Sequence, residues 1–225
     1  MRYYAIIVAG GSGTRMKTEK AKQFLLLNDL PILMHTINAF HQCDVKPEIV
    51  LVLNIDQHLY WEDLCTKYDF TVPHQVVKGG DQRYHSVKNG LKVVKGSAVI
   101  AVHDAVRPLV SAKLIQESFN VAADKGNAVA AIQAVDSIRI RQAGDTMAIN
   151  RDDVFLIQTP QTFQLAQLKK AYEQPFRNDF TDDASVVEKA GFPIHLIIGE
   201  RENLKITYPI DLEMASLLLQ KKGSC

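Results

Sequence analysis

Short apolar runs and longer segments with helical spacing alternate along the chain. The apolar runs, which we expect to be strands, cover residues 3–9, 48–53, 73–77, 97–102, 128–134 and 194–198. The intervening pattern predicts helices over residues 31–41, 56–68, 82–94, 111–125, 165–172 and 182–190 and from residue 209 onward. Strands that alternate with helices indicate an α/β fold with a largely parallel sheet. We expect Pro31 at the first position of its helix and Ser111 as a helix cap.

One segment departs from this alternation. In residues 136–151, apolar and basic residues alternate up to Arg141, a turn follows at Gly144, and a second short run leads back. This pattern is typical of a β-hairpin, and we expect it to project from the main sheet as an arm. Because no repeat or linker is evident elsewhere, we expect one domain, residues 1–225, with the arm as an insertion.

Composition narrows the class of protein. The 225 residues include 26 basic and 25 acidic side chains, and the net charge of +1 argues against a surface dedicated to nucleic acid. No apolar run approaches the roughly 18 residues needed to cross a membrane, and no signal peptide precedes the first strand. The three cysteines fit neither a disulfide framework nor a zinc site. We therefore expect a cytoplasmic protein with reduced thiols.

A glycine-rich loop after the first strand is the first candidate ligand site. It reads Ala9-Gly10-Gly11-Ser12-Gly13-Thr14-Arg15-Met16, and Lys22 follows. Glycines let the backbone approach a ligand and turn its N–H groups toward an anion, and Arg15 and Lys22 would supply positive charge. The loop lacks the ending of a P-loop and the third glycine of the dinucleotide fingerprint. A nucleoside triphosphate fits it better than NAD, although a tight turn with solvated lysines has the same pattern.

The second cluster follows the third predicted strand. Gly79, Gly80 and Asp81 open a helix that carries Arg83 and Ser86 on one face. These side chains could contact a base, a ribose or a phosphate. The alternative is that Asp81 only caps the helix.

The third cluster, residues 103–108, lies at the edge where open α/β sheets bind ligands. Asp104 could bind a metal ion or a substrate hydroxyl, and Arg107 could bind a phosphate. Alternatively, these two residues form a structural ion pair. His103 could be a base, but we expect a buried histidine bonded to the backbone.

The fourth group is spread over the last third of the chain. It comprises Arg151 after the hairpin and residues 158–161, 181–185 and 203–207. Residues 181–185 fit a helix cap as well as a ligand contact. Lys205 lies in an apolar, strand-like run, where a charge is costly unless it meets an anion.

These motifs, in this order, resemble the 2-C-methyl-D-erythritol 4-phosphate cytidylyltransferases of non-mevalonate isoprenoid synthesis. The matching segments are residues 9–16, 22–23, 79–86, 103–108, 158–161, 181–185 and 203–207, which extend over nearly the whole chain. The resemblance implies a doubly wound, Rossmann-like nucleotidyltransferase fold and a homodimer that exchanges arms. It also implies transfer of a cytidylyl group from CTP to the polyol phosphate, with Mg²⁺ held mainly by the CTP phosphates.

The resemblance also implies roles for individual residues. The CTP site would comprise Ala9, Gly10, Gly11, Gly13, Thr14, Gly80, Asp81, Ser86 and Ala105. The polyol phosphate would meet Asp104, Arg107 and Thr181, together with Ser137 and Arg151 from the arm of a second subunit. Arg15, Lys22 and Lys205 would be the catalytic residues, because they would stabilise negative charge on the reacting phosphates.

Three alternatives share part of this pattern. Ribitol-5-phosphate cytidylyltransferases share the first loop, but they tend to have serine where this chain has Ala105, and residues 181–188 follow the erythritol pattern. A sugar-1-phosphate nucleotidylyltransferase would not predict the last two motifs together. A non-catalytic nucleotide-binding protein is disfavoured because every basic position that the reaction needs is filled.

Two positions depart from the family: Ser137, where threonine is common, and Thr14, where a second arginine is common.

Overall fold

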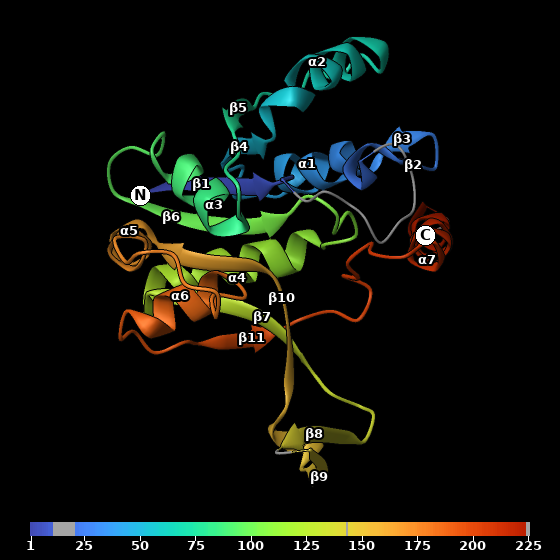
Figure 1. Ribbon diagram of the computed structural model, residues 1–225. Coiled ribbons are helices and arrows are strands. Elements are labelled where there is room, and N and C mark those ends of the chain that lie inside the picture. The colour runs from blue at the N-terminus through green and yellow to red at the C-terminus, as the bar shows by residue number, and fades with distance from the viewer. Residues whose placement is uncertain (11–20, 143, 224–225) are drawn as a thin grey trace.

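A seven-stranded sheet forms the centre of the computed structural model, which describes residues 1–10, 21–142 and 144–223 (Figure 1). Its strands, in spatial order, are β11 (Leu196–Ile198), β7 (Asn127–Gln133), β10 (Phe155–Gln164), β6 (Ala98–Asp104), β1 (Arg2–Val8), β4 (Glu48–Leu53) and β5 (Gln75–Lys78). Neighbouring strands are parallel, except that β10 runs antiparallel to both β6 and β7. The expected mostly parallel sheet is therefore confirmed.

Helices cover both faces of this sheet. They are α1 (Ile32–Gln42), α2 (His58–Lys67), α3 (Arg83–Leu91), α4 (Ala112–Lys125), α5 (Leu165–Ala171), α6 (Asp183–Lys189) and α7 (Pro209–Gly223). Alternate residues of β1 point to opposite faces: Ala5 and Ile7 join the core under α1 and α4, whereas Tyr4 and Ile6 join the core shared with α3 and α5. Because both faces are buried, the inner strands read as continuous apolar runs. This arrangement confirms the doubly wound architecture.

Helix ends follow the expected chemistry at two positions. The Ser111 hydroxyl accepts the N–H of Leu114 at 3.0 Å and caps α4. Asp182 caps α6 by accepting the N–H of Ser185 at 2.8 Å, and the Ser185 hydroxyl accepts the N–H of Asp182 in return. The capping interpretation of residues 181–185 is thus confirmed.

A small hairpin that the sequence pattern did not predict precedes α1. Its strands β2 (Leu26–Leu27) and β3 (Leu30–Pro31) pair across a turn at Asn28 and Asp29, whose φ angles are 46° and 64°. Asn and Asp tolerate this left-handed conformation better than most residues. Pro31 therefore belongs to β3 and is the N-cap of α1, so its expected place as the first helical residue was wrong.

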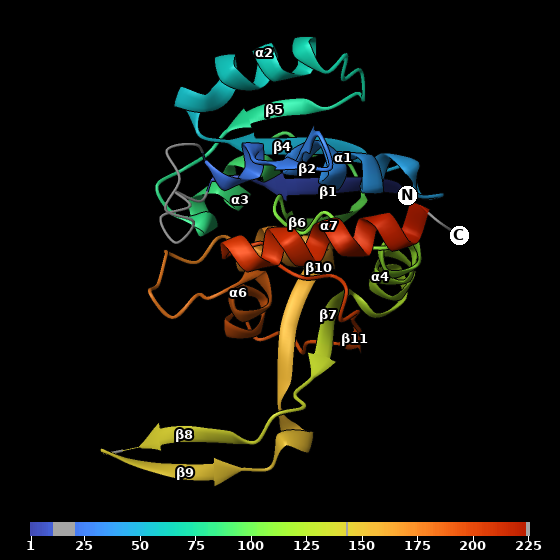
Figure 2. The ribbon, with the colours of Figure 1, turned by 90° about the vertical axis from the view of Figure 1, so that its right-hand side faces the viewer.

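The predicted arm is present. Strands β8 (Ile138–Gln142) and β9 (Asp145–Ile149) pair antiparallel with each other and with no other described strand. They project away from the helices, and the outer ends of β7 and β10 lead to them (Figure 2). A short 3-10 helix, η4 (Arg151–Asp153), connects β9 to β10.

Two further segments differ from the sequence-based expectation. Residues 155–164 form β10, which the sequence pattern did not predict because the segment contains polar residues and Pro160. The Thr159–Pro160 peptide bond is cis, and the pairing of β10 with β7 shifts register at this point. Residues 203–207, expected as strand-like, form no strand, although the N–H of Ile206 bonds to the Val106 carbonyl at 2.9 Å. Among the described helices, none combines the length and apolar character of a membrane span.

Candidate active site

Three loops that follow parallel strands meet at one edge of the sheet. Ala9 follows β1, Gly79 follows β5 and Ala105 follows β6. Each donates its N–H to a carbonyl at the end of a neighbouring strand, at 2.8, 2.8 and 3.1 Å respectively. These bonds extend the sheet ladder beyond the strand ends. They bring the first three sequence clusters together at the edge where α/β sheets bind ligands.

One serine hydroxyl joins two of these loops. Ser86 Oγ, in the first turn of α3, accepts the N–H of Gly80 at 3.0 Å. A Cβ on Gly10 would lie 3.3 Å from this hydroxyl, and a Cβ on Gly80 would collide with a side chain of α3. Asp81 is exposed, and the N-cap of α3 is Gln82, so Asp81 does not cap this helix. The glycines therefore permit a close approach of three backbone segments.

A buried carboxylate with three cations around it lies at the end of β6. Asp104 is 8% exposed, and its Oδ2 lies 2.9 Å from Lys205 Nζ and 3.4 Å from Arg107 Nε. Its Oδ1 lies 3.7 Å from Arg83 Nε. Burial alone would raise the pKa of Asp104, but the charges of Arg83, Lys205 and Arg107 outweigh burial and hold this pKa well below its usual range. Asp104 is therefore a carboxylate at neutral pH.

These surroundings do not suit Asp104 as a metal ligand, which was one of its expected roles. Both of its oxygens already face cations, and a metal ion would be repelled by the same three side chains. Within the described ranges, no three His, Cys, Asp or Glu side chains are grouped so that they could hold a metal ion.

Two lysines that are far apart in the sequence lie on segments that meet near the end of β1. Lys22 begins a short 3-10 helix, η2 (Lys22–Phe24), and its Nζ donates to the carbonyl of Ile206, the residue after Lys205, at 3.2 Å. The next residue, Gln23, is 2% exposed and donates its side-chain amide to the Ala9 carbonyl at 2.9 Å. These contacts connect both lysine-bearing segments to the end of β1.

A pocket of about 280 Å³ opens beside Asp104. Its lining includes Arg83, Arg107, Thr159, Thr181, Asp182 and Lys205. Strand β10 supplies one wall: Thr159 Oγ1 accepts the N–H of Asp104 at 3.1 Å, and the Gln161 amide donates to Asp182 Oδ2 at 2.8 Å. The pocket therefore has a side with three cations and a side of amides and hydroxyls to which Asp182 adds a carboxylate.

Asn203 connects these two sides. It is fully buried, and its side-chain amide donates to the Thr159 carbonyl at 2.8 Å. Its own backbone carbonyl accepts Arg107 Nη1 at 2.7 Å. Because Lys205 follows two residues later, these bonds also fix the segment that carries Lys205. The lysine in the apolar run therefore meets an anion, as the sequence argument required, and that anion is Asp104.

The histidine beside Asp104 is not placed as a base. His103 is fully buried, its Nε2 bonds to the Arg107 carbonyl at 3.2 Å, and its ring packs edge-on against Phe40. Burial lowers the pKa of His103 to about 4. The imidazole is therefore neutral at pH 7, and the expected buried histidine bonded to the backbone is confirmed.

This histidine predicts a loss of stability in mild acid. The unfolded chain binds a proton at His103 near pH 6.5 and the folded chain only near pH 4, so the free energy of unfolding decreases as the pH falls between these values. The difference is on the order of 3 kcal/mol. Denaturant unfolding at pH 7 and pH 4.5 should show a smaller change in His103→Gln than in the unmodified chain. His41→Gln, at an exposed histidine, should keep the full change; the same change in His103→Gln would contradict the prediction.

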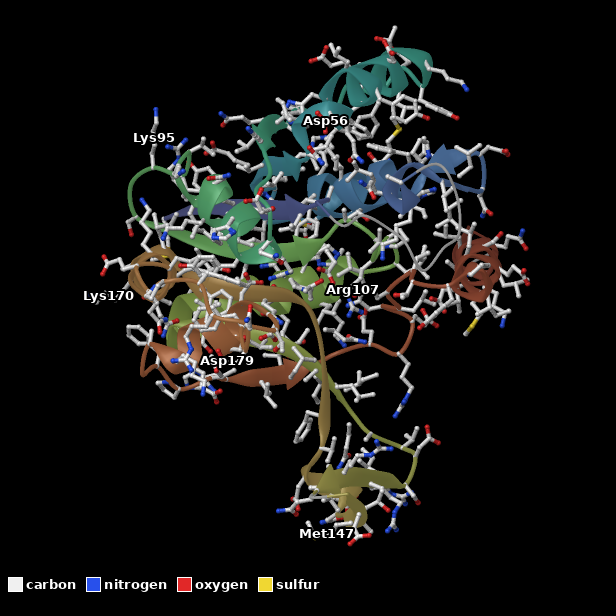
Figure 3. All side chains as sticks on the ribbon, viewed as in Figure 1. Asp56, Lys95, Arg107, Met147, Lys170 and Asp179 are labelled. Atoms are coloured by element: carbon white, nitrogen blue, oxygen red, sulfur yellow. The ribbon has the colours of Figure 1, made fainter. Side chains whose placement is uncertain are left out.

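The structure brings some predicted site residues together and leaves others apart. Asp104, Arg107, Lys205 and Thr181 surround the pocket. Ser137 and Arg151 are exposed near the base of the arm, and neither lines this pocket. The predicted loop residues Gly11, Gly13, Thr14 and Arg15 lie outside the described residues. Figure 3 shows Arg107 in the middle of the molecule and Met147 at the far end of the arm.

Two features were missed by the sequence argument. Arg83, which could contact a ligand, is also paired with two carboxylates, and its closer partner, Asp183, is 100 residues away. Ala105 was expected beside CTP; it is buried, and its carbonyl accepts the Thr36 hydroxyl at 2.8 Å. The partner of Arg83, Asp183, could be suspected from the sequence only because it lies in the polar motif of residues 181–185.

The sequence matches the family model described as 2-C-methyl-D-erythritol 4-phosphate cytidylyltransferase over residues 3–221. The chain belongs to this family. Relatives that carry this name include the proteins of Porphyromonas gingivalis, 49% identical over 217 residues, and Bacteroides fragilis, 46% identical over 215 residues. Each alignment covers 96% of this chain, and 97% and 98% of the respective relative.

Solved structures of the cytidylyltransferase family have the same fold. The 4-diphosphocytidyl-2C-methyl-D-erythritol synthase of Anaerococcus prevotii is 27% identical, with a TM-score of 0.83 over 97% of this chain and 98% of that one. The cytidylyltransferase of Thermus thermophilus is 26% identical, with a TM-score of 0.78 over 98% and 100%. The α/β nucleotidyltransferase fold that the motifs implied is confirmed.

Proposed function

We propose that this chain transfers the cytidylyl group of CTP to 2-C-methyl-D-erythritol 4-phosphate, in isoprenoid precursor synthesis. Membership of the cytidylyltransferase family over residues 3–221 is the observation that carries the proposal. An oxygen of the polyol phosphate attacks the α-phosphorus of CTP. A new P–O bond forms there, the bond to the β-phosphate breaks, and pyrophosphate leaves. The product is 4-diphosphocytidyl-2-C-methyl-D-erythritol.

The charges around the pocket support a reaction between two polyanions. A phosphate monoester is already an anionic nucleophile at neutral pH, so the site needs no general base, and the neutral, buried His103 is consistent with this. The task of the protein is to hold both anions together and to stabilise the added negative charge. Arg107 and Lys205 supply positive charge beside Asp104.

We assign the two substrates to the two halves of the site. CTP would lie over the loops of Gly10 and Gly80 and the first turn of α3 with Ser86, with Lys22 near its phosphates. The polyol phosphate would occupy the pocket beside Asp104, which can accept hydrogen bonds from the polyol hydroxyls. Its phosphate would compete with Asp104 for Lys205, because these two groups are only 2.9 Å apart.

A divalent cation is part of this proposal. Mg²⁺ keeps several waters and commonly binds through substrate phosphates rather than through an all-protein cage. The cations around Asp104 leave the CTP phosphates as the better ligands.

The exposed apolar residues of the arm support a homodimer. Five large apolar side chains on the arm and on the outer part of β10 are 40–51% exposed: Ile140, Met147, Phe155, Leu156 and Ile157. Ile140 and Met147 are paired across the hairpin, and exposed apolar residues gathered in this way are typical of an interface. We propose that a second copy covers it. Ser137 and Arg151 would then reach the pocket of that second copy.

The proposed reaction predicts a specific choice of substrate. With Mg²⁺ and CTP, pyrophosphate should be released with 2-C-methyl-D-erythritol 4-phosphate and at least about 100-fold more slowly with ribitol 5-phosphate, since a site built to bond particular hydroxyls rejects a different polyol. A coupled phosphate assay measures both rates. Release with ribitol 5-phosphate alone would move the chain to the ribitol activity. Release with neither would contradict the proposed function.

A further inference from the structure

Arg83 bridges two carboxylates at the back of the pocket. It is the first residue of α3, and its Nη2 lies 2.6 Å from Asp183 Oδ2, while its Nε lies 3.7 Å from Asp104 Oδ1. The Asp183 side chain is fully buried, whereas the Arg83 side chain is 29% exposed and lines the pocket. The guanidinium is therefore held from the interior of the protein and reaches toward the substrate side.

Asp183 is itself held in place by aromatic residues. Its Oδ1 accepts the Tyr172 hydroxyl at 2.6 Å, and the Tyr172 ring stacks on Tyr84 with 4.7 Å between the ring centroids. Tyr84 follows Arg83 in α3, and its hydroxyl donates to the Tyr172 carbonyl at 3.0 Å. These contacts join the start of α3 to the residues between α5 and α6. Asp183 therefore cannot follow a displaced Arg83 side chain without disturbing this packing.

Stability alone is a weak explanation for this ion pair. Desolvation of two buried charges largely offsets their attraction, so packed apolar residues of similar volume would stabilise the fold as well or better. An ion pair with a purely structural role would also need only one anion beside Arg83. Arg83 has a second anion, Asp104, and that one lies in the substrate pocket.

We propose that Arg83, clamped by Asp183, is a positioning residue that orients Asp104 for the polyol phosphate; this role rests on the proposed function. By facing Oδ1, Arg83 leaves Oδ2 to Lys205 and Arg107 and fixes the plane of the carboxylate. Without it, Asp104 is free to turn toward the two remaining cations. The oxygen that accepts polyol hydroxyls would then be misplaced, whereas the CTP loops would be unaffected.

The first test uses the full-length chain with the double substitution Arg83→Gln/Asp183→Asn. It removes the cation and the anion together, so neither buried charge is left unpaired. We expect the KM for 2-C-methyl-D-erythritol 4-phosphate to rise about tenfold or more, with the KM for CTP changed by less than about threefold. Arg83→Lys, which keeps the charge and loses the planar fork, should recover only part of this effect.

The matched control is Arg177→Gln/Asp179→Asn, which neutralises an exposed pair joined at 2.9 Å. It should leave both KM values unchanged, and all variants should keep a cooperative thermal transition. Equal rises in both KM values for the Arg83 double variant would overturn the proposal, because they would indicate a general disturbance of the fold. An unchanged KM for the polyol phosphate would overturn it as well.

A second readout does not depend on turnover. In chain labelled with ¹³C at the aspartate carboxyl groups, the Asp104 resonance should titrate at a higher pH in the Arg83 double variant than in the unmodified chain. The charge of Arg83, together with those of Lys205 and Arg107, lowers the pKa of Asp104 against the effect of burial. If the unmodified chain does not use the polyol phosphate, the proposed function fails, and this titration alone decides whether Arg83 holds Asp104. An unshifted titration would refute that contact.

Discussion

Replacing Lys205 or Lys22 with methionine should lower the turnover number by about 10²–10³, which corresponds to ~3–4 kcal/mol of lost transition-state stabilisation. Lys205 Nζ lies 2.9 Å from Asp104, and Lys22 Nζ donates to the carbonyl of the neighbouring Ile206. The Lys205 ammonium is thus held at the pocket and the Lys22 ammonium beside the segment that carries Lys205. We expect both charges to matter most when negative charge develops at the α-phosphorus. Methionine keeps a long unbranched side chain and removes that charge.

Pyrophosphate release at saturating substrates measures this effect. Lys170→Met is the control, because its ammonium pairs with Glu173 on an exposed surface, at 2.8 Å, far from the pocket (Figure 3). It should retain normal turnover. Near-normal turnover in Lys22→Met or Lys205→Met would remove that lysine from the chemical step. A variant that lacks a cooperative thermal transition would report on folding instead, and Lys205→Arg would then separate charge from fold.

Mixing two inactive variants should restore activity if the arm of one subunit completes the site of the other. In a dimer of Arg151→Ala with Lys205→Ala, one site combines both defects and the other has neither. Random exchange of equal amounts makes half of the dimers mixed, so the mixture should regain about one quarter of the unmodified activity. Each variant alone should remain near background.

The control for this experiment mixes Lys22→Ala with Lys205→Ala. Both lysines lie on the body of the protein, so every site in the mixed dimer keeps one defect and no activity should return. Subunit exchange is monitored by native mass spectrometry of chains that carry different labels. Exchange without recovery in the Arg151 mixture would show that each site is built within one chain.

The strands and helices that could be predicted are those whose burial follows a simple period. Residues 48–53 were predicted as a strand and form β4, because a strand covered on both faces is a continuous apolar run. Strand β10 was missed for the opposite reason. Residues 158–161 are polar and include a proline, yet they are buried. Their polar groups are satisfied by hydrogen bonds to distant residues such as Asp182 and Asn203, and the local sequence pattern does not reveal these partners.

The candidate site was predictable where a residue follows a strand, and less so where its partner is distant. Asp104 could be placed at the ligand edge from the end of an apolar run alone. Lys205 could be expected to meet an anion, but the choice between a substrate phosphate and Asp104 needed the fold. Arg83 and Ser86 were expected to act together because they are three residues apart, but they bond in different directions, Arg83 to Asp183 and Ser86 to Gly80.

The position of β10 has a consequence for how the chain assembles during synthesis. In the described sheet, β7 has β10 and β11 as its neighbours, and β10 alone links β7 to β6. A growing chain that ends before residue 155 can therefore pair β1, β4, β5 and β6, but its β7 has no place beside them. Non-local pairing of this kind is slow and leaves apolar strands exposed until the partner is made. Because β10 also carries Thr159 and Gln161, the strand that joins β7 to β6 adds one wall of the pocket, and Thr181, Asp182 and Lys205 follow later in the chain.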